Sequence, residues 1–316
     1  MPAISSILGS IKLGYKDDSL SYQGLGHRNL ILMMVLLNSY LENRREIPFR
    51  LITVEEPEAH LCVNNILLMA SFINIFSQKT GCSQLIYSTH NTEFVNKMGL
   101  DNVVVLHHGN AFCLKQELSD YERDYLTRHP NTDILNILFS RRVILVEGVT
   151  EELLIKSYLQ TKPELNEIKV LSFHKGFKSI INIWKKANNG NGSKLGVIRD
   201  RDDNQEHARE EHESLQDEQV IVRTTEQYTL EPEIVETGDN CALLKREYGS
   251  IYGWTDKSKG QIQEDWRQRK TDVILRIIKD LASEKLSTFM MPRHIQEVID
   301  FMQSEEITDS RENDAH

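Results

Sequence analysis

Two pairs of carboxylates stand where apolar segments with the composition of buried strands end. Glu147 directly follows one such segment, and Glu151 comes four residues later, on the first turn of the expected next helix. Asp200 and Asp202 follow a second segment further along the chain. Carboxylate oxygens suit Mg²⁺ or Mn²⁺ rather than zinc. Either pair alone is compatible with a solvated strand end, but two pairs at the separation of two β–α units favour one metal site at the carboxyl edge of a sheet.

A second set of residues has the chemistry of nucleotide hydrolysis. Glu55 and Glu56 end another apolar strand, an arrangement in which the first acid lies near Mg²⁺ and the second polarises the attacking water. His90 ends the following strand, where it is able to contact a γ-phosphate. Gly24 and Gly26 open a helix whose first backbone N–H groups can cradle phosphate. Each feature alone also fits an ordinary strand end, helix cap or turn, so the interpretation depends on their order.

The elements that must position these residues alternate between strands and helices, which predicts parallel α/β sheets. A helical region with an apolar face follows them, and no internal repeat is visible. The pattern predicts strands at 11–15, 49–54, 84–88, 102–107, 143–146, 168–173, 195–198 and 219–223, and helices at 29–41, 64–78, 151–160 and 177–186. Residues 241–303 are predicted to be mostly helical, with the apolar face at Val273, Ile274, Ile277, Ile278 and Leu281.

The composition is that of a soluble globular chain, with 40% apolar and 27% charged residues among 316. The formal net charge of −10 speaks against a general nucleic-acid binder. A site that holds metal through several carboxylates is itself acidic, however, and its metal reverses the local sign. The four cysteines show no CxxC spacing, and no apolar run is long enough to cross a membrane. These features predict a cytoplasmic protein without zinc, disulfides or membrane segments.

The residues of the second set resemble, in their order, part of an ABC-type ATPase of the RecF and SMC kind. The glycines match the signature loop, Glu56 the catalytic glutamate of the Walker B strand and His90 the switch histidine. Glu55 stands where the family usually has an aspartate. No segment matches the Walker A pattern GxxxxGK[ST], which holds phosphate through its amides and lysine. The sequence therefore predicts a truncated or split ATPase that binds ATP only if a missing segment or another chain supplies the Walker A lobe.

The segments around the first set resemble the acidic motifs of the Toprim domain of topoisomerases, primases and OLD-family nucleases. A partial ABC-type head followed by a Toprim domain resembles the OLD (overcoming lysogenization defect) family of ATP-dependent endonucleases, over about residues 10–300. The resemblance implies hydrolysis of DNA with two divalent ions. It makes Glu147, Glu151, Asp200 and Asp202 both catalytic residues and metal ligands.

Two later residues come from the same resemblance. Glu231 matches a later Leu-Glu motif of the family, which makes it a further metal ligand. Lys270 fits a late basic residue that would offset charge on the scissile phosphate, although Arg269 or Lys285 could take that role and Lys270 also fits an ordinary solvated lysine. The resemblance also implies a dimer, because an ABC signature loop faces nucleotide on a second head.

We therefore predict an α/β chain in five parts. They are part of an ATPase head (1–115), a helical connector (116–140), a parallel, Rossmann-like Toprim domain (141–240), a helical segment (241–303) and an unstructured tail (304–316). The leading hypothesis is a DNA endonuclease or nickase with a role in antiphage defence. Its partners are DNA and either a second copy or a chain carrying the Walker A lobe. The alternatives are a Toprim topoisomerase or primase, and a non-catalytic, ABC-head DNA-binding regulator.

Overall fold

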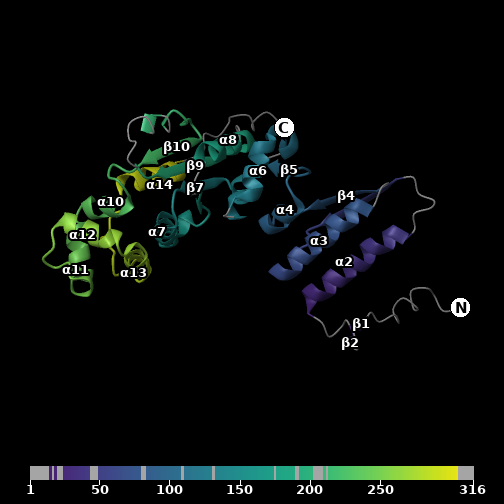
Figure 1. Cartoon of the computed structure of the whole chain (residues 1–316), viewed down its shortest axis with the longest axis horizontal. Coiled ribbons are helices and arrows are strands. Elements are labelled where there is room, and N and C mark those ends of the chain that lie inside the picture. Colours follow the sequence, from purple (N-terminus) through teal and green to yellow (C-terminus); the bar gives the residue numbers. More distant parts are fainter. Residues whose placement is uncertain are drawn as a thin grey trace, which may run out of the picture. The chain divides into compact units, whose positions relative to one another are not determined.

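The computed structural model of the chain divides into two compact units, Met1–Val103 and Val104–His316 (Figure 1). The beginning of the predicted strand 11–15 and the predicted tail after Ser304 lie outside the described residues, and so does Asp202. The structure describes residues 14–15, 18–19, 24–42, 49–79, 83–107, 110–129, 132–173, 176–188, 192–201, 209–210 and 213–304.

The first unit packs two parallel strands against helices. β3 and β4 pair in parallel through their full length, from Arg50 opposite Ser83 to Glu55 opposite Ser88. The predicted helix 29–41 is confirmed and begins earlier, at Leu25. β1 and β2 form a separate antiparallel pair. The elements are β1 (Gly14–Tyr15), β2 (Asp18–Ser19), α2 (Leu25–Glu42), β3 (Arg50–Glu55), α3 (Val63–Lys79), β4 (Ser83–Ser88) and α4 (Thr92–Met98).

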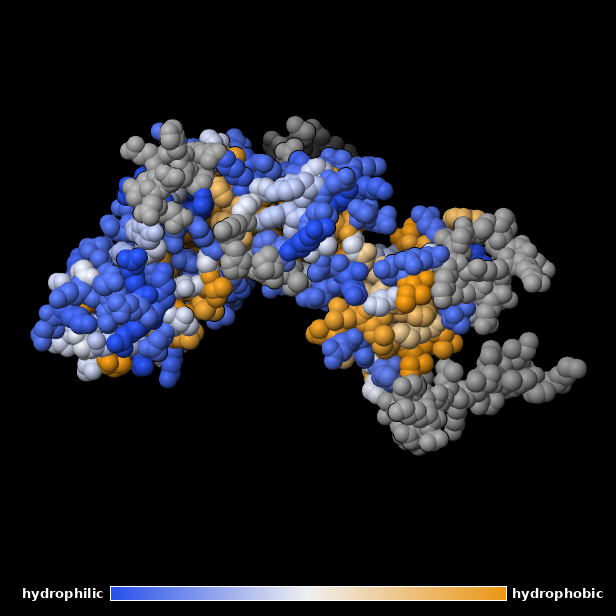
Figure 2. Space-filling view, in the orientation of Figure 1, coloured by the Kyte–Doolittle hydropathy of each residue, from blue (hydrophilic) through white to orange (hydrophobic). Residues whose placement is uncertain are grey.

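The β3–β4 pair has one covered face and one uncovered face among the described residues. Ile52, Leu85 and Tyr87 pack onto the core that α2 and α3 provide, whereas Leu51 and Ile86 are exposed. Further apolar side chains are exposed on α2 and α3, and Figure 2 shows apolar atoms gathered over this part of the first unit. Parallel sheets are normally covered on both faces. The exposed face of β3 and β4 is therefore an apolar surface of the kind that other segments cover in most parallel sheets.

The second unit is built on a four-stranded parallel sheet in the order β10-β9-β7-β8. The parallel sheet predicted for this part of the chain is confirmed. Because all four strands run the same way, their carboxyl ends meet at one edge. The elements are β7 (Arg142–Val146), α7 (Val149–Gln160), η3 (Pro163–Leu165), β8 (Lys169–Ser172), α8 (Phe177–Asn188), β9 (Lys194–Arg199) and β10 (Val220–Thr224).

One predicted strand pairs differently from the expectation. Residues 102–107 were expected to extend a parallel sheet, but β5 (Val104–His107) forms an antiparallel hairpin with β6 (Asn110–Cys113). Only two residues separate these strands, and a parallel pair needs a much longer crossover. Three short helices follow the hairpin: α5 (Leu114–Glu117), α6 (Asp120–Arg128) and η2 (Thr132–Leu138).

The C-terminal helices share one apolar core with the sheet. Of the predicted apolar face of α13, only Ile278 stays partly exposed, and the other four residues are buried. α14 covers β9 so closely that an added Cβ at Gly196 would overlap the Val298 side chain. No helix of the described ranges is long and apolar enough to cross a membrane. The helices are α10 (Leu230–Glu236), α11 (Asn240–Tyr252), α12 (Lys259–Arg267), α13 (Lys270–Ala282) and α14 (Arg293–Gln303).

Candidate active site

The first acidic pair lies where β7 passes into α7. The last four side chains of β7 are completely buried, so the strand is fixed in the sheet and delivers Glu147 to its carboxyl end. Gly148 is the N-cap of α7, and an added Cβ there would lie 2.6 Å from Glu151 Oε2. Glycine at this position therefore leaves room for the Glu151 carboxylate to fold back over the turn.

Glu151 is a buried carboxylate, 8% exposed, on the first turn of α7. Burial raises the pKa of Glu151, and the negative charges of Glu231 and Glu147 raise it further. Its own backbone N–H and the charge of Lys270 act in the opposite direction without cancelling the effect. Glu151 thus lies among carboxylates whose negative charge is only partly balanced by nearby positive groups.

Asp200 brings the end of β9 to the same cluster. Its backbone N–H donates to Glu147 Oε2 at 3.2 Å, which joins the ends of β9 and β7 directly. Burial raises the pKa of Asp200 to about 8, with further contributions from the charges of Glu151, Glu147 and Glu231. A carboxyl group with such a pKa holds a proton at neutral pH. The cluster therefore has an excess of negative charge that a bound cation would relieve.

Glu231 comes to the cluster from α10, well beyond the two strands. Its side chain is almost completely buried, accepts a hydrogen bond from Thr229 Oγ1 at 2.7 Å, and lies 3.0 Å from Lys270 Nζ. Lys270 is half-exposed at the beginning of α13. The structure thus brings together the glutamate and the lysine that the sequence placed 39 positions apart.

The two alternatives to Lys270 lie against other acids. Arg269 Nε is 3.7 Å from Asp265 Oδ1, and Lys285 Nζ is 3.3 Å from Glu247 Oε2 and 3.7 Å from Asp280 Oδ2. None of these acids belongs to the cluster of Glu147, Glu151, Asp200 and Glu231. The geometry thus favours Lys270 over both alternatives as the basic partner of that cluster.

Sequence reasoning missed a basic residue beside Glu147. Arg199 Nε lies 3.6 Å from Glu147 Oε2, and the Arg199 guanidinium lies 4.2 Å from the centre of the Phe177 ring. The stacking fixes the arginine, so its charge remains close to the acid. Arginines flank Asp200 on both sides in the sequence, and no local signal distinguishes the one that faces Glu147.

The donor set of this cluster fits a hard divalent cation in chemistry. All four described acids offer only oxygen, which suits Mg²⁺ or Mn²⁺. Burial, and after it the neighbouring carboxylates, raise the pKa of Asp200. This raised pKa also fits a site whose negative charge a bound cation would neutralise. Within the described part of the chain, no three carboxylate, histidine or cysteine side chains are arranged to hold one ion. Asp202, a predicted ligand, is not among those residues.

The predicted ATPase residues meet at the carboxyl ends of β3 and β4. Glu56 Oε1 lies 3.3 Å from His90 Nδ1, and the backbone N–H of Glu56 donates to the carbonyl of Ser88 at 3.0 Å. Glu55 is exposed at the end of β3. The backbone of Glu56 has a positive φ of 41°, which is uncommon outside glycine. The predicted catalytic glutamate and switch histidine are therefore neighbours in space.

A second link between the same two strand ends was not foreseen. Glu58 is buried and accepts a hydrogen bond from Thr89 Oγ1, and Thr89 Oγ1 in turn accepts one from the backbone N–H of Asn91 at 3.1 Å. Burial raises the pKa of Tyr87, and the charge of Glu58 adds to that effect. Two adjacent pairs, Glu56 with His90 and Glu58 with Thr89, thus join the loop after β3 to the end of β4.

The two glycines of the predicted signature loop have different surroundings. An added Cβ at Gly26 would overlap the carbonyl oxygen of His60, whereas nothing lies within 4 Å of one at Gly24. The close approach of α2 to the loop after β3 therefore accounts for glycine at position 26. A contact with phosphate remains a prediction for both glycines.

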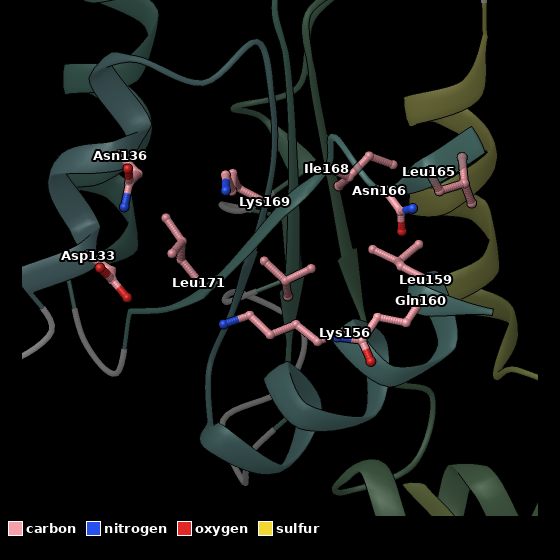
Figure 3. A pocket seen from close by; sticks show the side chains of 11 residues that line it. Asp133, Asn136, Lys156, Leu159, Gln160, Leu165, Asn166, Ile168, Lys169 and Leu171 are labelled. Carbon is pink, nitrogen blue, oxygen red and sulfur yellow. The ribbon is translucent and has the colours of Figure 1, made fainter. Parts of the chain in front are cut away.

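The second unit also contains a cavity of about 350 Å³ at the other edge of the sheet (Figure 3). Its lining includes Lys169 at the beginning of β8, Gln160 at the end of α7 and Asp133 of η2. The carboxylate cluster lies instead at the strand ends, where β7 and β9 finish. The cavity is therefore separate from the candidate active site.

Comparison with known proteins identifies both acidic regions. Residues 138–202 match the Toprim domain of overcoming lysogenization defect protein-like proteins. The chain carries an OLD-like Toprim domain. Residues 10–95 match an AAA ATPase domain. Endonuclease GajA of Bacillus cereus (strain HuB5-5) is 29% identical over 183 residues, a match that covers 48% of this chain and 26% of that relative.

These matches confirm the predicted resemblance to OLD-type nucleases and the order of an ATPase segment followed by a Toprim domain. The OLD-like Toprim match includes the positions of Glu147, Glu151 and Asp200, and its last residue is Asp202. Glu231 and Lys270 lie beyond it, so their place in the site depends on the geometry described above. The chain spans about a quarter of the relative it matches, and the whole relative's activity is not thereby assigned to it.

Proposed function

We propose that this nuclease-like chain hydrolyses phosphodiester bonds of DNA internally, as an endonuclease or nickase, at the carboxylate cluster of the second unit. The observation that carries the proposal is that four acids meet at one edge of the sheet and that nearby positive charges only partly balance them. These acids are Glu147, Glu151, Asp200 and Glu231. The similarity to an endonuclease and the OLD-like Toprim match support the reaction class.

The same four acids, together with the predicted ligand Asp202, would hold two Mg²⁺ or Mn²⁺ ions. Such ions supply a water nucleophile at neutral pH and stabilise the leaving 3′-oxygen. Asp200 would hold an ion as the deprotonated carboxylate, because the charge of the ion would offset the burial and the neighbouring acids that raise its pKa. Lys270, half-exposed beside Glu231, is available to offset charge that builds on the scissile phosphate.

Plasmid nicking tests this proposal. The purified chain, incubated with supercoiled plasmid and Mg²⁺ or Mn²⁺, should produce nicked or linear DNA, and Asp200→Ala should abolish the product. Asp256→Ala, which removes an exposed carboxylate elsewhere in the second unit, should retain it. Equal behaviour of the wild type and Asp200→Ala contradicts the proposal. A relaxed, covalently closed product would instead favour the topoisomerase alternative.

We further propose that an ATPase normally controls the nuclease and that its Walker A lobe comes from another segment or another chain. Supporting this are the absence of GxxxxGK[ST] from the 316 residues and the exposed apolar face of β3 and β4. The chain alone should then show no ATP hydrolysis above that of a Glu56→Gln variant. Robust turnover by the chain alone, lost in Glu56→Gln, would overturn this part of the proposal.

The proposal extends to partners and setting. DNA is the substrate, and a homodimer or a complex with the Walker A chain is the expected assembly, which light scattering of the purified protein would measure. A cytoplasmic location follows from the composition and the scattered cysteines. A role in antiphage defence follows from the family resemblance, and phage plating on cells with and without Asp200→Ala would test it.

A further inference from the structure

An exposed aromatic side chain lies in the loop that leads to Glu231, one acid of the carboxylate cluster. Tyr228 stands in the loop between β10 and α10 and is 41% exposed. The guanidinium of Arg267, at the end of α12, lies 5.6 Å from the centre of its ring. Arg267 also pairs with the exposed Glu264, with 3.5 Å between Nη1 and Oε2. The tyrosine is therefore held by a cation on one side while much of its surface stays open.

Both members of this pair lie close in the sequence to residues that contact Glu231. Thr229, which directly follows Tyr228, donates to Glu231 Oε2 at 2.7 Å. Lys270, three residues after Arg267, lies 3.0 Å from Glu231 Oε1. Both members of the pair are thus a few residues from groups that touch the same buried glutamate.

A second arginine holds the same loop from the β9 side. Arg201, the residue after Asp200, is exposed, and its Nη1 donates to the carbonyl of Glu226 at 2.7 Å. Its backbone N–H donates to Thr225 Oγ1 at 2.9 Å. In a chain with a net charge of −10, Arg201 and Arg267 thus each place a positive charge against the loop that carries Tyr228.

We propose that Tyr228, Arg201 and Arg267 form a clamp for an unpaired DNA strand that runs past the carboxylate cluster. This inference rests on the proposed function and adds a preference of that same site. A base would stack on the open part of the Tyr228 ring, and the two arginines would contact phosphates on either side. Bases in a duplex are stacked on one another and cannot offer their faces to the tyrosine. The clamp therefore selects DNA with unpaired bases at the point of cleavage.

Binding of a fluorescein-labelled oligothymidine tests the clamp, with Ca²⁺ replacing Mg²⁺ so that binding is measured without turnover. Loss of one stacked base should weaken binding of Tyr228→Ala about 5-fold to 150-fold, with no change in salt dependence. Tyr228→Phe should bind like the wild type. Arg267→Ala and Arg201→Ala should each lower the slope of log K against log salt by about 0.7, the value for one phosphate of a single strand.

Matched controls use residues of the same types elsewhere in the second unit. Tyr121→Ala removes a tyrosine that is 70% exposed, and Arg128→Ala removes an exposed arginine that also pairs with an acid, so both should bind normally. Thermal unfolding of every variant shows whether it is folded.

Three results would overturn the clamp: unchanged binding by folded Tyr228→Ala, equal weakening by Tyr228→Phe, or duplex DNA of matching sequence bound as tightly as the single strand. Failure of the clamp is distinguishable from failure of the nuclease proposal. If Tyr228→Ala binds normally while Asp200→Ala still abolishes nicking, the nuclease proposal stands and only the clamp is wrong. If the wild type never nicks plasmid, the nuclease proposal fails, and the oligothymidine data still decide whether the clamp binds single strands.

Discussion

The charge excess at Asp200 predicts a substitution that stabilises the protein while destroying its proposed activity. Burial, with the neighbouring acids, raises the pKa of Asp200 from 3.8 to about 8. The folded metal-free protein therefore binds a proton that the unfolded chain releases above its ordinary pKa. For an acid with a raised folded pKa, stability falls as pH rises from 3.8 to about 8. Asp200→Asn keeps the shape of the side chain and removes this penalty.

The size of the effect follows from the same values. Each pH unit between the two pKa values corresponds to about 1.4 kcal/mol, so at pH 7 the penalty is about 4 kcal/mol. Asp200→Asn should then unfold about 10 °C higher than the wild type, because 1 kcal/mol shifts the midpoint of a unit of this size by about 2–4 °C. Near pH 3 the two proteins should unfold at almost the same temperature, since the Asp200 carboxyl is then mostly protonated in both states.

Tryptophan fluorescence during heating in EDTA is a suitable measurement. All three tryptophans, Trp184, Trp254 and Trp266, are buried in the second unit, so the signal reports on the unit that contains Asp200. Asp256→Asn makes the same chemical change at an exposed position and should leave the midpoint unchanged. Addition of Mg²⁺ should raise the midpoint of the wild type and not that of Asp200→Asn. A variant no more stable than the wild type at pH 7, or a difference that does not grow from pH 5 to 8, would refute the reasoning.

Three further predictions concern other parts of the molecule. Gly26→Ala adds a Cβ that overlaps the carbonyl of His60, so it should make the first unit more sensitive to limited proteolysis, although alanine ordinarily favours a helix. Gly24→Ala should be tolerated, because nothing lies within 4 Å of its new Cβ. Equal effects of the two substitutions would contradict the packing role of Gly26. Burial lowers the pKa of His294 to about 4, so folding stability should decline by about 3 kcal/mol as pH falls from 6.5 to 4. Urea unfolding of His294→Gln should lack that decline. Lys270→Ala should reduce plasmid nicking at least tenfold, an outcome that rate measurements beside Lys285→Ala would check.

The sequence predicted the parts of the fold that local patterns encode. Apolar runs located β7 and β9, and the acids that follow them indicated the edge of the sheet where Glu147 and Asp200 now lie. The same logic located β3, β4 and the two long helices of the first unit. It failed for β5, because a run of apolar residues does not reveal whether its partner runs parallel or antiparallel.

Contacts between distant segments could not be predicted in the same way. The stacking of Arg199 on Phe177, the hydrogen bond from Thr89 to Glu58 and the packing of Gly26 against His60 all join residues with no recognisable spacing. Family resemblance suggested Glu231 and Lys270 but left three basic residues open. The tertiary structure favours one of them through the ion pair with Glu231.

The raised pKa of Asp200, caused first by burial and then by the neighbouring acids, has a consequence for the history of this chain. Asp200→Asn is expected to stabilise the metal-free fold, so a lineage that no longer needed the site would gain stability by losing this acid. Without a function to preserve, that gain in stability would favour asparagine over aspartate at position 200. The acids retained in this sequence are thus what the proposed reaction would require, since stability alone would favour their loss.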